Sequence, residues 1–251
     1  MIGLDRFREF FKGHENKFAV IGGTACHLHF ESLGATFRAT KDVDMVICVE
    51  MLDAEFATRF LRFIETGGYQ ARERGDRRRE FYRFHKPQDP SFPDMLELFA
   101  RPGASLDLAE SATYVRLNVE NDIASLSAIL LNDAYYKALL SGRVEVAGIP
   151  VLSPELLIPF KARAFIDLDD RRRRGEAVST NEIRKHARDV FRLLQILAGD
   201  ASVPLDDEIS ADLSRFITVI ESDEDFRPKD FDVPETRESG CASLRQIYGM
   251  Q

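Results

Sequence analysis

Cysteines and long hydrophobic runs are both scarce in this sequence of 251 residues. The three cysteines, Cys26, Cys48 and Cys241, are odd in number and widely spaced, so they predict no disulfide framework and favour a reducing cytoplasm. No stretch approaches the roughly 18 consecutive apolar residues of a membrane-spanning helix. The N-terminal segment is charged and amphipathic and lacks the features of a signal peptide. We therefore expect a cytoplasmic protein that does not enter a membrane.

Several catalytic and metal-binding signatures are also missing. The sequence has no Gly-Lys-Ser/Thr phosphate loop and no Gly-x-Ser-x-Gly nucleophile turn, which argues against the enzyme classes that depend on them. Cys26 and His29 share one face of an expected helix, but no second pair has zinc-ligand spacing, so packing is the favoured interpretation. With 44% hydrophobic and 30% charged residues, the composition is that of an ordinary globular protein with a real core.

The net charge of -8 argues against a protein that coats nucleic acid by bulk attraction. Residues 201–251 hold 12 acidic and 5 basic side chains, so this acidic tail carries almost all of the excess. A solvated surface is the simpler interpretation of the tail. Two basic clusters, at residues 72–86 and 171–174, lie in the nearly neutral remainder. Arg77, Arg78 and Arg79 either grip the phosphates of a nucleic-acid acceptor or form a solvated hairpin tip, whereas the second cluster follows three aspartates and can neutralise itself.

Hydrophobic periodicity predicts alternating helices and strands in the first part of the chain, up to residue 152. This alternation favours an α/β fold, with a mixed sheet and helices packed on it. A further helix and a short hairpin end this core. The expected elements are helices at 4–12, 24–33, 54–66 and 122–140 and strands at 18–21, 42–49, 69–74, 80–85 and 95–99, with the hairpin at 144–151.

Residues 153–251 predict a helical region with an acidic, partly irregular tail. Ser153 and Pro154 are typical of a helix start, and the helical pattern continues to about residue 198. Pro159 should kink that helix or restart it. Ser179 and Glu182 have capping-box spacing, so the last strong helix should begin near residue 180. Residues 222–240 lack periodicity, which predicts a loop or a loosely ordered tail.

Gly22, Gly23 and Thr24 lie between an expected strand and an expected helix. Two glycines there let the backbone approach a ligand without clashes from a Cβ atom. The first turn of the helix offers free N–H groups and the positive end of the helix dipole to a phosphate. Thr24 either caps the helix or donates its hydroxyl to that phosphate.

Three carboxylates accompany this turn. Asp42 and Asp44 are two residues apart in an expected strand, so they point to the same face. Two like charges there repel unless a cation lies between them, and carboxylate oxygens suit magnesium. Glu97 interrupts a later apolar strand, where a buried carboxylate is costly unless a metal binds it. Asp94 is the competing third ligand, although its place at the start of that strand favours exposure.

Each of these features has a simpler explanation when taken alone. A Gly-Gly turn is often structural, an Asp-x-Asp pair is often a solvated strand end, and a glutamate can be an edge-strand charge. Their occurrence together, in this order and in this expected strand and helix context, favours a site over chance.

These motifs resemble the nucleotidyltransferase superfamily in its AbiEii-type branch. The superfamily pattern is Gly-Gly-Ser/Thr, then an Asp-x-Asp/Glu pair, then a third acid on a neighbouring strand, which here corresponds to residues 22–24, Asp42 with Asp44, and Glu97. The branch adds a lysine and an aspartate in the C-terminal helical part, matched by Lys161 and Asp189. The resemblance covers about residues 17–198. Threonine replaces the usual serine, and glutamate replaces the usual third aspartate.

The resemblance implies transfer of a nucleoside monophosphate from a nucleoside triphosphate (NTP) with Mg²⁺, at a site for two metal ions. It implies that Asp42, Asp44 and Glu97 are metal ligands and that Glu97 helps to activate the acceptor. Lys161 would contact the triphosphate, and Asp189 would position Lys161 or the base. Members of this branch include toxins of toxin–antitoxin systems, some of which modify transfer RNA, so RNA as acceptor and an antitoxin as partner are implied. The alternative is a catalytically silent binding or scaffold protein that retains the fold.

The residues around Lys161 and Asp189 leave other interpretations open. Lys161 lies among apolar residues, from which its long side chain can extend to the surface. Asp189 forms a polar stripe with Lys185 and Arg192 along one helix, which equally fits a ladder of surface ion pairs.

Overall fold

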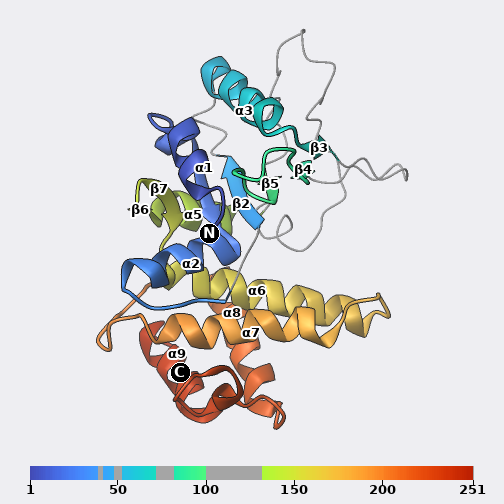
Figure 1. The fold of residues 1–251 in the computed structure, drawn as a ribbon. Coiled ribbons are helices and arrows are strands. Elements are labelled where there is room, and N and C mark those ends of the chain that lie inside the picture. The colour runs from blue at the N-terminus through green and yellow to red at the C-terminus, as the bar shows by residue number, and fades with distance from the viewer. Residues whose placement is uncertain (39–41, 48–52, 72–81, 100–131, 251) are drawn as a thin grey trace. The chain divides into compact units, whose positions relative to one another are not determined.

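The computed structural model describes residues 1–38, 42–47, 53–71, 82–99 and 132–250 (Figure 1). The chain divides into two compact units. The first, which we call the sheet unit, comprises Met1–Leu131 and Leu139–Leu152. The second, the helical unit, comprises Asn132–Ala138 and Ser153–Gln251. Because each unit has its own internal packing, we describe them separately.

The described strands of the sheet unit form one mixed seven-stranded sheet in the order β3-β4-β5-β2-β1-β7-β6. The central strands β2 and β5 run parallel, as do β1 and β7, whereas the other neighbours are antiparallel. The predicted mixed α/β fold is therefore confirmed. The strands are β1 (Phe18–Ile21), β2 (Asp42–Ile47), β3 (Gln70–Ala71), β4 (Tyr82–His85), β5 (Met95–Phe99), β6 (Arg143–Val146) and β7 (Ile149–Leu152).

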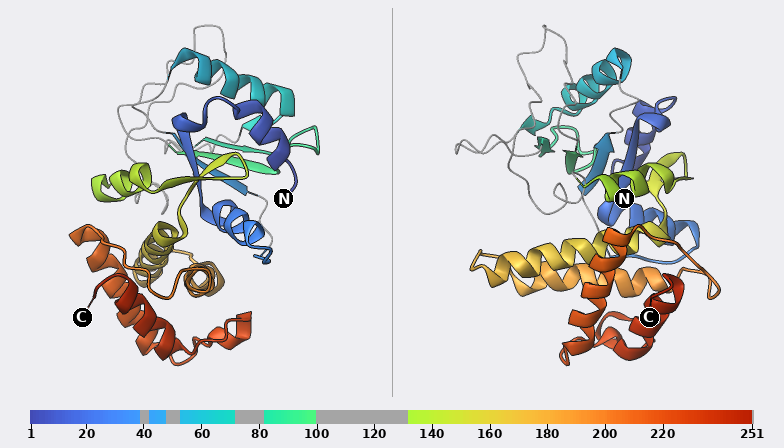
Figure 2. Two further views of the ribbon diagram at one scale, coloured as in Figure 1. Left: turned by 90° about the vertical axis from the view of Figure 1, so that its left-hand side faces the viewer. Right: turned by 180° about the vertical axis from the view of Figure 1, so that it is seen from behind.

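One face of this sheet is covered by an aromatic core from α1 (Leu4–Phe11) and α3 (Ala54–Gly67). Phe18 of β1 lies on that face, with its ring 5.6 Å from that of Phe7 and 6.2 Å from that of Phe56. The opposite face carries α2 (Gly22–Ser32), as the left view of Figure 2 shows. Side chains alternate between the two faces along a strand, so Ile21, three positions after Phe18, lies on the face of α2. Its neighbour in register on β2, Asp44, lies on the same face.

Local sequence explains where the elements of the sheet unit end. Asp53 caps α3 by accepting a hydrogen bond from the N–H of Phe56, and Gly68 ends the helix in the left-handed conformation at φ 62°. Ala147 and Gly148 connect β6 and β7 with φ values of 51° and 75°, as a tight hairpin turn requires. The predicted hairpin with Gly148 in its turn is confirmed.

The helical unit is built on two long helices that pack on each other, α6 (Pro154–Arg173) and α7 (Thr180–Leu194). Shorter helices pack against this pair (Figure 1). Ser179 and Glu182 form the predicted capping box, and the helix they cap begins at residue 180. Also in this region is α5 (Asp133–Ser141), which passes from the helical unit into the sheet unit. The other helices are α6 (Pro154–Arg173), α7 (Thr180–Leu194), α8 (Asp207–Ser222) and α9 (Arg237–Ile247), with short 3₁₀ turns η1 (Glu15–Lys17) and η3 (Pro228–Phe231).

For two expectations in the C-terminal region, the structure excludes one of the two alternatives. The helix does not restart at Pro159, because α6 runs unbroken from Pro154 to Arg173 with the proline inside its second turn. Residues 222–240 form a loop, as one alternative predicts, that also contains η3 and the start of α9. The loop is packed and not loose, because Phe226 is buried against Phe191 with ring centroids 5.0 Å apart. Such isolated apolar anchors lack periodicity, so a pattern search does not detect them.

No helix in the described ranges is both long and apolar enough to cross a membrane.

Candidate active site

The helix α2 begins at Gly22, not at residue 24 as the sequence predicts. Gly22 has φ 69°, a left-handed backbone conformation that favours glycine, and Gly23 and Thr24 complete the first turn. Ile21 is the N-cap residue and no side chain caps the helix, so the interpretation of Thr24 as the cap is wrong. Thr24 is fully buried, and its hydroxyl donates to Sδ of Met1 at 3.5 Å.

Asp44 and Glu97 are direct neighbours on parallel strands β2 and β5. On its other side, Asp44 is paired with Ile21, the last residue of β1 before α2. Residues in register point to the same face of a sheet, and for Asp44 and Glu97 that face is the one covered by α2. Asp44 is 8% exposed and Glu97 is half-buried. The sheet thus holds two carboxylates side by side where α2 begins.

The carboxylate of Asp44 lies directly against the backbone of Gly22. A Cβ atom built on Gly22 would overlap Oδ2 of Asp44 and would lie 2.8 Å from its Cγ. The acid and the start of the helix are therefore in van der Waals contact. An anion at that end of a helix is favoured by the helix dipole.

Asp42 and Arg83 are backbone neighbours of the pair formed by Asp44 and Glu97. We call Asp42, Asp44 and Glu97 the carboxylate row. Asp42 precedes Asp44 by two positions in β2 and is in register with Met95, while its side chain lies outside the described residues. Arg83 of β4 is in register with Glu97, and its side chain also lies outside them. The sequence interpretation did not single out Arg83, although the polar character of the 80–85 segment was visible.

The donor chemistry of this face suits a hard divalent cation. Carboxylate oxygens are the ligands that Mg²⁺ prefers, and a cation relieves the repulsion between Asp44 and Glu97. Within the described residues, no group of three or more His, Cys, Asp or Glu side chains is placed to hold a metal ion. The side chain of Asp42, the third acid of the predicted set, lies outside the described residues.

Lys161 and Asp189 form a buried ion pair inside the helical unit. The ammonium of Lys161 in α6 donates to Oδ2 of Asp189 in α7 at 2.8 Å. The two side chains are 7% and 1% exposed. Extension of Lys161 to the surface and a surface ladder at Asp189 are therefore both wrong. The contact between the two residues matches the one that the resemblance implies, while their role in a reaction stays a prediction.

Other charged or ligand-like residues serve packing. Asp169 is buried and accepts hydrogen bonds from Arg172 and Arg173, so the arginine run after it is partly neutralised by its own helix, as its sequence suggests. Cys26 is fully buried, and His29 is hydrogen-bonded to the carbonyl of Leu152 at 2.8 Å, in agreement with packing. The arginines at 77–79 lie outside the described residues.

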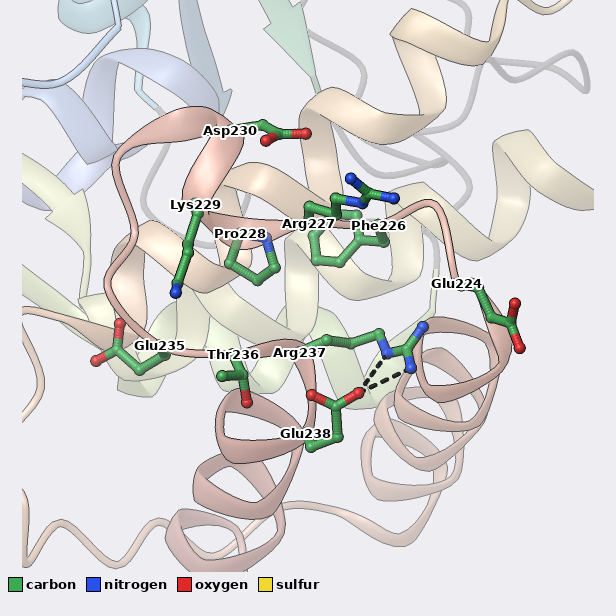
Figure 3. Close-up of a pocket in the computed structure, with 10 residues that line it drawn as sticks. All are labelled: Glu224, Phe226, Arg227, Pro228, Lys229, Asp230, Glu235, Thr236, Arg237 and Glu238. Atoms are coloured by element: carbon green, nitrogen blue, oxygen red, sulfur yellow. Dashed lines mark hydrogen bonds and ion pairs between the residues drawn. The ribbon is translucent and has the colours of Figure 1, made fainter.

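A separate hollow of about 410 Å³ lies in the helical unit beside η3 and the start of α9 (Figure 3). Its lining mixes acidic and basic side chains, and Arg237 and Glu238 form an ion pair at 2.8 Å across part of it. None of the predicted site residues lines it. Its mixed charge gives no preference for an anionic or a cationic ligand.

A mixed sheet with two carboxylates beside a glycine-rich helix start is the arrangement that the nucleotidyltransferase resemblance predicts. Residues 7–246 match the family described as nucleotidyl transferase AbiEii toxin, type IV TA system. The match spans most of the chain, which therefore belongs to this nucleotidyltransferase family. The family prediction made from the motifs is confirmed.

The sequence was also compared with curated proteins and the fold with solved structures. No curated protein matches the sequence. Among solved structures, the solution structure of the antibiotic-resistance factor ANT(2'')-Ia is similar over 84% of this chain and 89% of its own, with 14% sequence identity and a TM-score of 0.33. A similarity at that TM-score carries no argument about the site.

Proposed function

We propose that this protein transfers a nucleoside monophosphate from an NTP to a macromolecular acceptor, with Mg²⁺ bound at the carboxylate row. The observation that carries the proposal is the pairing of Asp44 with Glu97 next to the first turn of α2. It puts cation ligands and a helix N-terminus, which favours phosphate, in the same part of the sheet unit. Membership of the AbiEii family supports the same reaction.

The acidic residues have the role of metal ligands in this proposal. Asp42, Asp44 and Glu97 would hold Mg²⁺, and Glu97 would also help to activate the acceptor. Bound Mg²⁺ neutralises charge on the phosphates and lowers the pKa of an attacking hydroxyl. The backbone N–H groups of Gly22, Gly23 and Thr24 would receive the phosphates at the positive end of α2.

Lys161 would bind the triphosphate, and Asp189 would orient Lys161. A lysine ammonium is a compact point charge that suits a phosphate oxygen. A buried carboxylate that accepts its hydrogen bond at 2.8 Å fixes the direction of an otherwise flexible side chain. The same contact also joins α6 to α7, so a structural contribution accompanies the proposed one.

RNA is the acceptor that we propose, with transfer RNA as its first candidate, and an antitoxin is the proposed partner. The antitoxin is suggested by the family description, a toxin of a type IV TA system, whereas the RNA acceptor is what the resemblance of the motifs implies. The net charge of -8 means that binding of RNA would depend on local basic groups.

The proposal is tested by incubating the full chain with each labelled NTP, Mg²⁺ and total RNA, and by following label in RNA. We expect label from at least one NTP, lost on chelation of the metal and in Asp44→Ala. Asp94→Ala is the matched control, because Asp94 is an exposed acid just before β5. Absence of labelled product with every NTP, together with retained NTP binding, would favour the silent scaffold instead.

A further inference from the structure

Gly22 lies against the carboxylate of Asp44. The space that a side chain on Gly22 would occupy is filled by the carboxylate of Asp44, with Cγ at 2.8 Å and Cβ at 3.3 Å from the position of an ideal Cβ atom. Both residues belong to the sheet unit, and the pairing of Ile21 with Asp44 fixes the register that brings them together. The contact is thus a consequence of strand pairing and not of a flexible loop.

An aspartate needs such a contact to aim its oxygens. The last torsion of an aspartate side chain is soft and has broad minima, so strand geometry alone does not fix where the two oxygens point. A backbone surface pressed against Oδ2 restricts that rotation. The same surface is the first residue of α2, whose dipole favours the ionised carboxylate.

We propose that Gly22 is a positioning residue for Asp44. Because Gly22 has no Cβ atom, the carboxylate packs against its Cα and is held in the orientation that binds the metal. The inference rests on the proposed function, since it assigns Asp44 to the metal. It gives Gly22 a role that Gly23 does not have. The missing side chain of Gly22 makes room for the acid, which is a second role beside the phosphate contact proposed for the backbone N–H groups of the motif.

Gly34 supplies a matched control at the other end of the same helix. Its φ is also 69°, so alanine there meets the same backbone strain as alanine at Gly22. An added Cβ at Gly34 has no heavy atom within 4 Å. A difference between Gly22→Ala and Gly34→Ala therefore reports contact with Asp44 and not backbone strain.

The first measurement is the affinity of each full-length variant for Mn²⁺ alone, without nucleotide, by calorimetry or electron paramagnetic resonance. We expect Gly22→Ala to bind Mn²⁺ about tenfold to a hundredfold more weakly than the unmodified protein, as is typical when a residue that orients a metal ligand is changed. Gly34→Ala should bind as the unmodified protein does. Equal affinity in Gly22→Ala and Gly34→Ala would overturn the proposal.

The second measurement is a double-mutant cycle in thermal stability, which needs neither metal nor activity. In Asp44→Ala the acid that the new methyl group meets is gone. Adding Gly22→Ala to Asp44→Ala should then lower the melting temperature only as much as Gly34→Ala does. In the unmodified background it should lower the melting temperature further. If Gly22→Ala does not fold, a folded double variant still supports the contact, and an unfolded one contradicts it.

The two measurements separate this inference from the proposed function. Coupling in the cycle with no Mn²⁺ binding by the unmodified protein would reject the metal site and with it the positioning role. Normal Mn²⁺ binding without coupling, or without loss in Gly22→Ala, would reject the role of Gly22 and leave the metal site standing.

Discussion

Two buried or half-buried pairs of charged side chains, one in each unit, differ in sign. In the sheet unit, Asp44 and Glu97 put two like charges on adjacent strands and on one face. In the helical unit, the buried Lys161 and Asp189 are of opposite sign and are joined at 2.8 Å. Asp169 and Asp212 of the helical unit are likewise bonded to arginines.

This difference predicts different consequences of mutation for the two pairs. Neighbouring like charges repel and lower stability, so a fold keeps them where a cation or a reaction needs them. In a buried pair of opposite charges, each side chain neutralises the other. Removal of one side chain leaves the remaining charge in the interior without that neutralisation. We therefore expect changes to the first pair to affect turnover and changes to the second to affect stability.

The largest effect is expected from Asp44→Ala on Mg²⁺-dependent nucleotide transfer. Loss of a metal ligand removes several kcal/mol of charge stabilisation in the transition state, which corresponds to roughly a thousandfold slower turnover. The free energy of unfolding should stay equal or rise, since repulsion with Glu97 disappears. Rates from product label and urea unfolding curves measure the two quantities. Unchanged turnover would reject the role of Asp44.

Lys161→Met should have the largest effect on stability. It removes the ammonium that Asp189 accepts from and leaves that carboxylate charged and buried, so the free energy of unfolding should fall by about 3–5 kcal/mol. Chemical denaturation measures this loss. Restoration of most of the stability in Lys161→Met/Asp189→Leu would show that the stranded charge causes it.

The same Lys161 variants test whether the pair is only structural. If Lys161 binds the triphosphate, the double variant should be folded but impaired in NTP affinity or turnover. A stable double variant with normal NTP binding and transfer would remove Lys161 and Asp189 from the site.

Gly23→Val sharpens the comparison within the sheet unit. A β-branched side chain in the first turn of α2 would crowd a bound phosphate, so the NTP dissociation constant should rise at least about tenfold, or about 1.4 kcal/mol. Calorimetry with each NTP measures it, and Gly34→Ala again serves as control. An unchanged constant would mean that the Gly-Gly start of α2 is structural only.

The smallest effect is expected for a charge pair near the surface of the helical unit. The hydrogen bond from Arg215 lowers the pKa of Asp170 below its ordinary value of 3.8. Because the folded-state pKa is the lower one, the pair stabilises the fold at neutral pH, and this contribution is lost as the pH falls through the folded-state pKa. Both side chains are partly exposed, so solvent screens the pair to at most about 1 kcal/mol.

Arg215→Ala should accordingly destabilise the fold slightly at neutral pH, and its difference from the unmodified protein should vanish in acid. Thermal melts across an acidic pH series measure this. Arg227→Ala is the control, since within the described residues its guanidinium has no hydrogen bond or ion pair. A difference that persists unchanged in strong acid would contradict the role of Asp170.

Much of the sheet unit could be predicted from the sequence because strands and caps are local. Alternation of apolar residues predicted β2, an apolar run after Pro93 predicted β5, and turn chemistry predicted the Gly148 hairpin. The start of α2 was predicted two residues late, since two glycines are poor helix formers and only the packed sheet holds them in a helical turn. The packing of the 222–240 loop was missed because Phe226 is buried without periodic neighbours.

By itself, the sequence determined the family and predicted the members of the candidate site, because Gly-Gly-Thr, the aspartate pair and Glu97 occur in a fixed order along strands of recognisable period. Tertiary structure alone decided which of the predicted residues contact one another. Lys161 and Asp189 are 28 positions apart on different helices, and each looks like a surface residue until α6 packs on α7. Likewise, only strand pairing brings the carboxylate of Asp44 onto Gly22, since register between distant strands depends on the whole sheet and not on either segment.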